Sequence, residues 1–262
     1  MSTGTMNKVT TIGWSNMSWN PISGCRHACR STYCYNTMKS TAWLNRFGAR
    51  YWNDRQGKFV KVKQWRRRET KNHNLYIARP GEVYPRGYDP TFYEHRLDQP
   101  GTATDPARVF VVDVGDMLGQ WVPAKWIKSI IESMEKYSWH KYFILTKNPS
   151  RYAAFQWPKN AWLGATITSD TDVATLRIMQ AVKHPHKFLS FEPLFGPVTS
   201  SLQGIQWVVI GAMTGRNPPI PNPAWVDVIV KEARRVRAQI YMKDNLLKNY
   251  NGNGRTIYRQ KP

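Results

Sequence analysis

The chain has almost no cysteine. Its three cysteines, Cys25, Cys29 and Cys34, all lie in the stretch GCRHACRSTYCYN, and the rest of the 262-residue sequence contains none. An odd number of clustered thiols excludes a complete disulfide framework, and a chain of this length can bury a core without disulfides. The cluster therefore predicts metal ligation or redox chemistry in a reducing compartment.

Long apolar runs are also absent. No stretch reaches the roughly 18 apolar residues of a membrane-spanning helix. The N-terminal stretch MSTGTMNKVTTIGWS has no apolar run preceded by basic residues, so it does not resemble a secretory signal. We therefore expect a cytoplasmic protein without a membrane partner.

Acidic residues are few. The chain has 17 Asp and Glu against 38 Lys and Arg, which gives a net charge of +21. This excess exceeds what solubility requires and indicates a polyanionic partner. No clear basic amphipathic helix points to a membrane surface, so nucleic acid, either DNA or RNA, is the expected partner. A basic surface without a specific partner is the alternative.

From Arg108 onward, short apolar runs alternate with helical patterns. Helices are expected after Pro123, after the capping-box pair Ser169 and Asp172, and from Asn222. The runs that predict buried parallel strands are 107–113, 141–146, 161–166, 187–192, 206–211 and 239–244.

A further strand over 9–13 and a helix over 36–47 bring the count to about seven strand–helix units. The whole chain, 1–262, is thus predicted to be one α/β domain. Its expected architecture is a complete or partial parallel (β/α) barrel of about six or seven units, and an open doubly wound sheet is the alternative.

Residues 50–106 interrupt this alternation and form an insertion in the predicted barrel. Between Arg55 and Arg79 there are nine Lys or Arg and one acid, Glu69, with aromatic residues interleaved through the wider segment. Basic side chains bind phosphates and aromatic rings stack on unpaired bases, so the insertion is a candidate nucleic-acid-binding surface. Alternatively, its aromatic residues form a small core of their own. The residues expected to contact nucleic acid are Lys61, Lys63, Trp65, Arg66, Arg67 and Arg68.

Polar residues stand where the predicted strands end. In parallel barrels, reactive groups lie at the carboxyl ends of the strands, and the cysteine loop follows the first predicted strand. Each polar residue either binds a ligand there or forms a structural ion pair at the rim. These strand-end residues are Asp113, Asp116, Thr146, Lys147, Thr166, Thr168, Glu192, Lys243 and Asp244.

Three thiolates suit either zinc with a fourth ligand or a [4Fe-4S] cluster in which one iron has no protein ligand. For zinc, His27 is the local fourth ligand, but its place between two cysteines makes it hard to reach the same ion. His95, His184 and His186 are distant alternatives. The absence of a clear fourth ligand favours the cluster, and a metal-free loop is the third possibility.

The cysteine loop resembles that of the radical S-adenosylmethionine (SAM) superfamily. The resemblance rests on the spacing Cys25-x-x-x-Cys29 and on the aromatic Tyr33 before Cys34, although four residues rather than the usual two separate Cys29 from Cys34. In that superfamily the open iron binds SAM, and an electron from the cluster cleaves it to a 5'-deoxyadenosyl radical. The resemblance implies an external electron donor such as a flavodoxin or ferredoxin.

A wider set of motifs is similar to the three-cysteine-motif proteins of phages and bacteria, which are regarded as relatives of radical SAM enzymes. The matching stretches are WSNMSWNPISGC, YDPTFYEHRLDQP, VFVVDVGDMLGQWVP, FILTKNPSRY, WPKNAWLGATI, KFLSFEPLFGPV, QWVVIGAMTG and IYMKDN.

This resemblance implies a role for each matching position. Cys25, Cys29 and Cys34 would ligate the cluster, and Tyr33 would lie near the adenine of SAM. The other implied cofactor-binding residues are Asp113, Gly115 and Asp116 in DVGDM, in place of a glycine-rich motif, together with Lys147, Thr166, Glu192 and Lys243.

The resulting hypothesis is a radical SAM enzyme that modifies or repairs nucleic acid. The alternatives are a zinc-stabilised nucleic-acid-binding protein without catalysis and a radical SAM enzyme that acts on a small molecule or peptide. Trp14 and Trp19, which flank the loop, are expected to pack and exclude water rather than react.

Overall fold

The protein is built on one sheet of eight strands. The computed structural model describes residues 5–8, 12–27, 41–63, 75–214, 218–250 and 255–262. Every neighbouring pair from β2 to β13 is parallel, and β1 pairs antiparallel with β2 at the edge. In spatial order the strands are β1 (Asn7–Lys8), β2 (Met17–Trp19), β8 (Arg108–Val111), β9 (Lys141–Thr146), β10 (Ala161–Thr166), β11 (Lys187–Phe191), β12 (Trp207–Ile210) and β13 (Gln239–Met242).

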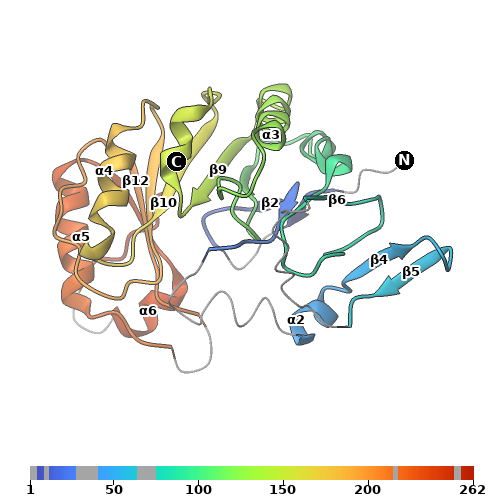
Figure 1. Cartoon of the computed structure of the whole chain (residues 1–262). Helices are drawn as coiled ribbons and strands as arrows, with labels where there is room; N and C mark the ends of the chain where they lie inside the picture. The colour runs from blue at the N-terminus through green and yellow to red at the C-terminus, as the bar shows by residue number, and fades with distance from the viewer. Residues whose placement is uncertain (1–4, 9–11, 28–40, 64–74, 215–217, 251–254) are drawn as a thin grey trace.

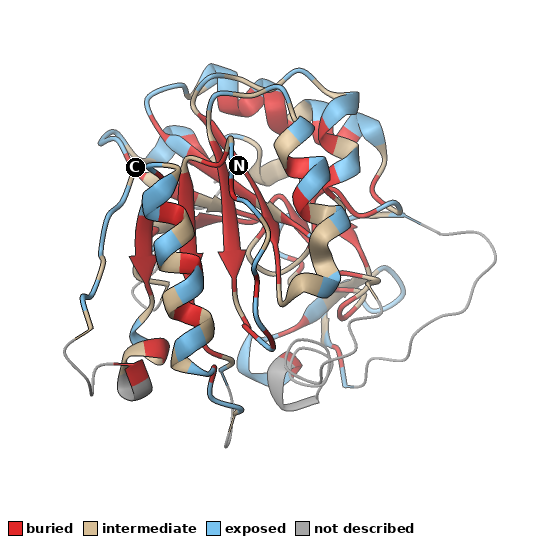
Figure 2. Ribbon diagram, turned by 90° about the vertical axis from the view of Figure 1, so that its left-hand side faces the viewer, coloured by how far each residue is buried: buried red, intermediate tan, exposed pale blue. Residues whose placement is uncertain are grey.

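Helices pack on one face of this sheet. α3 (Ala124–Lys136), α4 (Val173–Ala181) and α5 (Pro223–Arg235) join β8 to β9, β10 to β11 and β12 to β13, and Figures 1 and 2 show them along the outside of the sheet. Apolar residues on their inner sides share one core cluster with every second strand residue, such as Leu163 and Leu189. This burial stabilises the layer because each helix has one apolar stripe to cover.

The opposite face of the sheet carries aromatic side chains, and we call it the aromatic face. Trp162, Phe188 and Trp207 point to this face because they alternate with the residues that meet the helices. Trp14 lies over them, with its ring centroid 5.4 Å from that of Phe143 and 5.5 Å from that of Trp207. Trp14 therefore packs, as its sequence context indicates.

The sheet is not closed. Among the described residues, β1 and β13 form the two ends of the strand order and do not pair with each other, so a complete barrel is not formed. The order from β2 to β13 follows the sequence without the reversal that a doubly wound sheet requires. The helices α3, α4 and α5 also share one face of the sheet. A partial barrel remains a prediction.

The strands predicted from residue 107 onward correspond to β8 to β13, and two of them, β9 and β10, have the predicted bounds. The prediction of a first strand over 9–13 is wrong at residues 12 and 13. Of residues 9–13, residues 12 and 13 form a bend and the others lie outside the described residues, whereas β2 supplies the strand that pairs with β8. α2 (Thr41–Arg46) lies within the predicted helix 36–47, of which residues 36–40 are also outside the described part.

The insertion contributes strands to two small sheets, one of which also includes β3 from the N-terminal segment. One is the hairpin of β4 (Arg50–Asn53) and β5 (Lys58–Lys61), which Figure 1 shows extending away from the main sheet. The other has three strands in the order β3-β7-β6, namely β3 (Ile22–Ser23), β7 (Thr91–Phe92) and β6 (Tyr76–Ile77).

Short helices complete the described chain: the 3-10 helices η1 (Glu94–Arg96), η2 (Gln99–Thr102), η3 (Pro149–Ala154) and η4 (Asp170–Asp172), and the α-helix α6 (Asp244–Tyr250). Within the described residues, none of the helices has the length and apolar character needed to cross a membrane.

Candidate functional site

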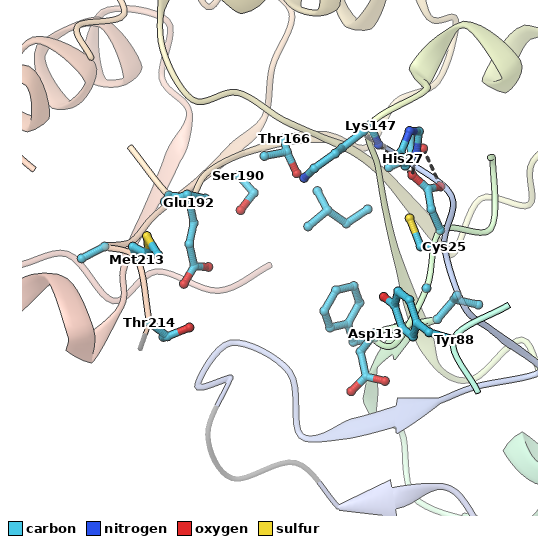
Figure 3. A pocket seen from close by; sticks show the side chains of 18 residues that line it. Cys25, His27, Tyr88, Asp113, Lys147, Thr166, Ser190, Glu192, Met213 and Thr214 are labelled. Atoms are coloured by element: carbon cyan, nitrogen blue, oxygen red, sulfur yellow. Dashed lines mark hydrogen bonds and ion pairs between the residues drawn. The ribbon is translucent and has the colours of Figure 1, made fainter. Parts of the chain in front are cut away.

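A cavity of about 230 Å³ opens where the parallel strands end, beyond the aromatic layer (Figure 3). The carboxyl ends of adjacent parallel strands meet at one edge, so residues far apart in sequence line it together. The lining residues are Cys25, His27, Tyr88, Phe110, Val112, Asp113, Gly115, Asp116, Leu145, Thr146, Lys147, Thr166, Ser190, Glu192, Pro193, Ala212, Met213 and Thr214.

Cys25 is held against the end of β8 by two glycines. The Gly24 amide donates to the carbonyl of Val114 at 3.0 Å, and Gly24 and Gly115 form a parallel bridge. A Cβ on Gly115 would lie 2.8 Å from the Gly24 oxygen, and Gly24 has a φ of +88°, so other residues are excluded on both sides of the contact. The backbone therefore fixes Cys25, which is 9% exposed, in the cavity wall.

Asp116 ties the cysteine segment to the ends of β8 and β9. One carboxylate oxygen accepts from the Leu118 amide at 2.9 Å and the Thr146 hydroxyl at 2.7 Å. The other accepts from His27 Nε2 at 2.7 Å and the Lys147 amide at 3.0 Å. Because the side chain is 6% exposed and both oxygens have two donors, Asp116 acts by positioning these segments.

Asp113 is the carboxylate with unused hydrogen-bonding capacity. Its Oδ1 is buried and has no hydrogen-bond partner within the described part of the chain. Burial raises the pKa of this carboxyl group, and hydrogen bonds from the side chains of Asn20 and Ser18 act in the opposite direction. Asp113 also lines the cavity, so its carboxyl group is a candidate acceptor for a cationic or hydrogen-bond-donating ligand group.

A second group of residues at the rim brings together three motifs that are far apart in sequence. Lys243 Nζ donates to both oxygens of Glu192, at 2.6 and 2.8 Å, and Asn245 Nδ2 donates to one of them at 3.2 Å. A Cβ on Gly211 would lie 2.9 Å from Glu192 Cδ, so the glycine makes room for the carboxylate. Lys243 and Glu192 thus form the rim ion pair that sequence analysis offered as an alternative to ligand binding, with 16% and 20% of their side chains exposed.

Hydroxyl groups line the cavity wall between the end of β8 and Glu192. Thr166 and Ser190 are 8% and 4% exposed and lie on adjacent strands of the aromatic face. In Figure 3 the Lys147 side chain extends along the rim toward Thr166. Ser190 was not predicted as a site residue, although its position two residues before Glu192 places both on the same face of the chain.

The other predicted metal and adenine contacts, Cys29, Cys34 and Tyr33, lie outside the described residues. Across the described ranges, no group of three or more His, Cys, Asp or Glu could hold a metal ion. His27, the local zinc candidate, donates to Asp116, and His184 and His186 precede β11, at the sheet edge opposite the cavity.

The predicted nucleic-acid contacts lie in the insertion. Lys61 and Lys63 are exposed and line a second cavity, whereas Trp65, Arg66, Arg67 and Arg68 lie outside the described residues. The aromatic residues of the insertion divide into two groups. Tyr88, Phe92 and Tyr93 are buried, with Tyr88 in a small cluster beside Cys25 and Phe92 in the main core, and Phe59 is 41% exposed.

Comparison with known proteins identifies a family. Residues 9–246 match the model of the family described as "Protein of unknown function (DUF5131)". No curated protein and no solved structure matches the chain.

Proposed function

The chain belongs to the DUF5131 family, and we propose that it is a radical SAM enzyme that modifies or repairs nucleic acid. The observation that carries the proposal is the composition of the cavity at the strand ends. A cysteine thiol, the Asp113 carboxyl group and several hydroxyl groups, among them those of Thr166 and Ser190, line one small space. Thiolates are ligands for iron–sulfur clusters, and SAM offers an ammonium, a carboxylate and ribose hydroxyls to the remaining groups.

Cys25 would hold a [4Fe-4S] cluster together with Cys29 and Cys34. When bound, the cluster would supply the electron that cleaves SAM. Cysteine thiolates are the usual ligands of such a cluster, and Cys25 lies in the cavity wall, which Asp113 and Gly115 also line. The bond from His27 to Asp116 would hold the start of the cysteine loop against the sheet.

The chain's own residues would bind and orient the remainder of SAM. Asp113 would accept a hydrogen bond from the ammonium group, and Thr166 and Ser190 would bond to hydroxyls. Lys243 would offer its charge to the carboxylate while it stays paired with Glu192. The packed aromatic layer below the cavity would exclude water from that side.

The charge of +21 supports a nucleic-acid substrate, and a flavodoxin or ferredoxin would be the external electron donor. The proposed location is the cytoplasm, where thiols stay reduced.

Anaerobic purification tests the cofactor. We expect a brown protein that contains iron and acid-labile sulfide, and a Cys25→Ala variant that loses both. Ser129→Ala, on the outer helix α3, is the matched control and should keep the wild-type content. A colourless protein that contains zinc would overturn the radical SAM proposal in favour of the zinc-stabilised alternative.

A further inference from the structure

The insertion contains a second and larger cavity of about 790 Å³, which we call the insertion groove. Its walls come from the hairpin β4–β5, from β6 and from the segment that follows β6. The lining residues are Tyr51, Trp52, Asp54, Val60, Lys61, Val62, Lys63, Tyr76, Arg79, Pro85 and Arg86.

Buried Glu82 joins the two walls of the insertion groove. Its carboxylate accepts from the Trp52 amide at 2.7 Å, from the Arg79 amide at 2.9 Å and from the Tyr76 hydroxyl at 2.9 and 3.0 Å. Glu82 is 1% exposed, so these bonds form away from water, where losing one is costly. Glu82 therefore fixes the backbone of Trp52 and the ring of Tyr76 in the walls of a preformed groove.

The charge of the groove is positive. Asp54, its one acidic lining residue, pairs with Arg79 at 2.6 Å. Lys61, Lys63 and Arg86 are the remaining cations in the lining. These three side chains suit a row of phosphates because each can replace condensed counterions on a nucleic-acid backbone.

Aromatic residues lie beside these cations. Tyr51 and Trp52 are half-buried on β4, and the Arg86 guanidinium lies 4.6 Å from the centroid of the Tyr76 ring. Burial, together with the bond to Glu82, raises the pKa of Tyr76 to about 12, so the ring stays neutral at physiological pH. Neutral aromatic rings beside cations bind single strands, whose unpaired bases can stack; in a duplex the base faces are already covered.

The groove is also connected to the cavity at the strand ends. A small core cluster contains Cys25 and Tyr88, which line that cavity, and Val62, which lines the groove; Tyr51 packs against the same cluster. The two spaces therefore have a common wall. A strand held in the groove would lie close to the site proposed for SAM cleavage.

We propose that the insertion groove binds single-stranded nucleic acid and presents it to the cavity at the strand ends. This inference rests on the nucleic-acid substrate proposed above and names its form. It assigns phosphate contacts to Lys61, Lys63 and Arg86 and base stacking to Tyr51 and Trp52.

The test is fluorescence anisotropy with the full chain and three labelled probes of one length: oligo(dT), oligo(U) and a DNA duplex. We expect both single strands to bind more tightly than the duplex, and the order of oligo(dT) and oligo(U) identifies DNA or RNA. The double variant Lys61→Gln, Lys63→Gln should flatten the plot of log affinity against log salt by about 0.7 for each lost phosphate contact. Trp52→Ala should weaken binding about fivefold or more through lost stacking.

Matched controls remove the same groups from other surfaces. Lys125→Gln with Lys128→Gln takes two exposed lysines from α3, and Trp139→Ala removes a tryptophan that is 42% exposed. Both should bind like the wild type. Because Trp52→Ala could unfold the hairpin, ultraviolet crosslinking of oligo(dT) to the wild-type chain is a second measurement, with adducts expected in residues 50–63 or 75–86.

Equal affinity for duplex and single strands, crosslinks only outside the groove, or groove variants with wild-type affinity would overturn the inference. Salt-dependent binding that the groove substitutions do not change would contradict this inference but not the proposed function. Conversely, a protein that binds single strands in the groove but contains no iron and does not cleave SAM would overturn the proposed enzymatic function. The inference about the groove would still hold.

Discussion

Single residues build the cavity at the strand ends through contacts that allow few substitutions. Gly24 and Gly115 bring Cys25 against the end of β8 because a Cβ on Gly115 would clash with Gly24, and one on Gly24 would clash with the backbone of Tyr88 and Asp89. Asp116 accepts four hydrogen bonds from three segments of the chain. The family resemblance implies that Asp116 contacts SAM, whereas its hydrogen bonds indicate a structural role. A conservative variant distinguishes these two roles.

Asp116→Asn should destabilise the fold rather than act only on ligand binding. Asparagine replaces one accepting oxygen by an amide nitrogen that donates. That nitrogen would face either His27 Nε2 and the Lys147 amide, or the Leu118 amide and the Thr146 hydroxyl, and each of these pairs consists of donors. We expect a loss of about 1–3 kcal/mol in the free energy of unfolding, measured by urea titration. Exposed Asp105→Asn is the control and should lie within experimental error of the wild type. Unchanged stability of Asp116→Asn would show that the carboxylate does not hold these segments together.

Several site residues could be predicted because parallel strands end at one edge. Asp113, Thr166 and Glu192 lie in separate motifs, yet the structure places all three in the lining of one cavity. The hydrogen bonds of Asp116 could not be predicted, since their donors are backbone amides and side chains brought together only by the fold. Ser190 was missed because the alternation of KFLSFE was used to identify a strand and not to identify its cavity-facing residues.

At the scale of elements, apolar runs with clear limits predicted the strands well. β9 and β10 have the expected bounds, since each run is buried on both faces. The β-branched residues in VTTIG predicted an N-terminal strand, whereas the strand that pairs with β8 is Met17–Trp19. The hairpin and α6 were missed, because short elements are decided by tertiary contacts rather than by periodicity.

The hairpin β4–β5 should depend on Glu82 for its position. Glu82→Gln replaces an acceptor of the Trp52 and Arg79 amides by a group that also donates, so the insertion should open locally. We expect faster cleavage by trypsin within residues 50–86 and weaker binding of oligo(dT), while the melting temperature of the main sheet changes little. Exposed Glu94→Gln should match the wild type. Equal proteolysis of both variants would contradict this role of Glu82.

His140 at the start of β9 should make stability depend on pH. Its Nδ1 accepts from the Ala107 amide at 3.1 Å, so Nε2 carries the proton and donates to the Pro100 carbonyl at 3.0 Å. Burial lowers the pKa of His140, and it also lowers those of His95 and His186.

Below the unfolded histidine pKa of about 6.5, the unfolded chain therefore takes up protons that the folded chain does not. The free energy of unfolding should be full above that pH and fall as the pH is lowered from about 7 to about 5. Urea titrations at several pH values measure this. His140→Asn should show a smaller decline, and an equally steep decline in that variant would contradict the assignment.

The whole molecule has helices on one face of its main sheet (Figure 2), aromatic packing on the other, and a cavity at the strand ends (Figure 3). The basic insertion adjoins that cavity through the cluster of Cys25, Val62 and Tyr88. In the proposals above, the insertion binds a polymer and the strand ends carry the cofactor chemistry. The two functions should therefore be separable by substitution.

Radical SAM chemistry is tested by chromatography of 5'-deoxyadenosine formed from SAM by the anaerobic protein with dithionite as reductant. We expect product from the wild type and from Lys61→Gln, Lys63→Gln, and none from Cys25→Ala, Cys29→Ala or Cys34→Ala. Asp113→Asn should raise the SAM concentration needed for half-maximal rate. No product from an iron-loaded wild-type chain, or undiminished product from Cys34→Ala, would contradict the account.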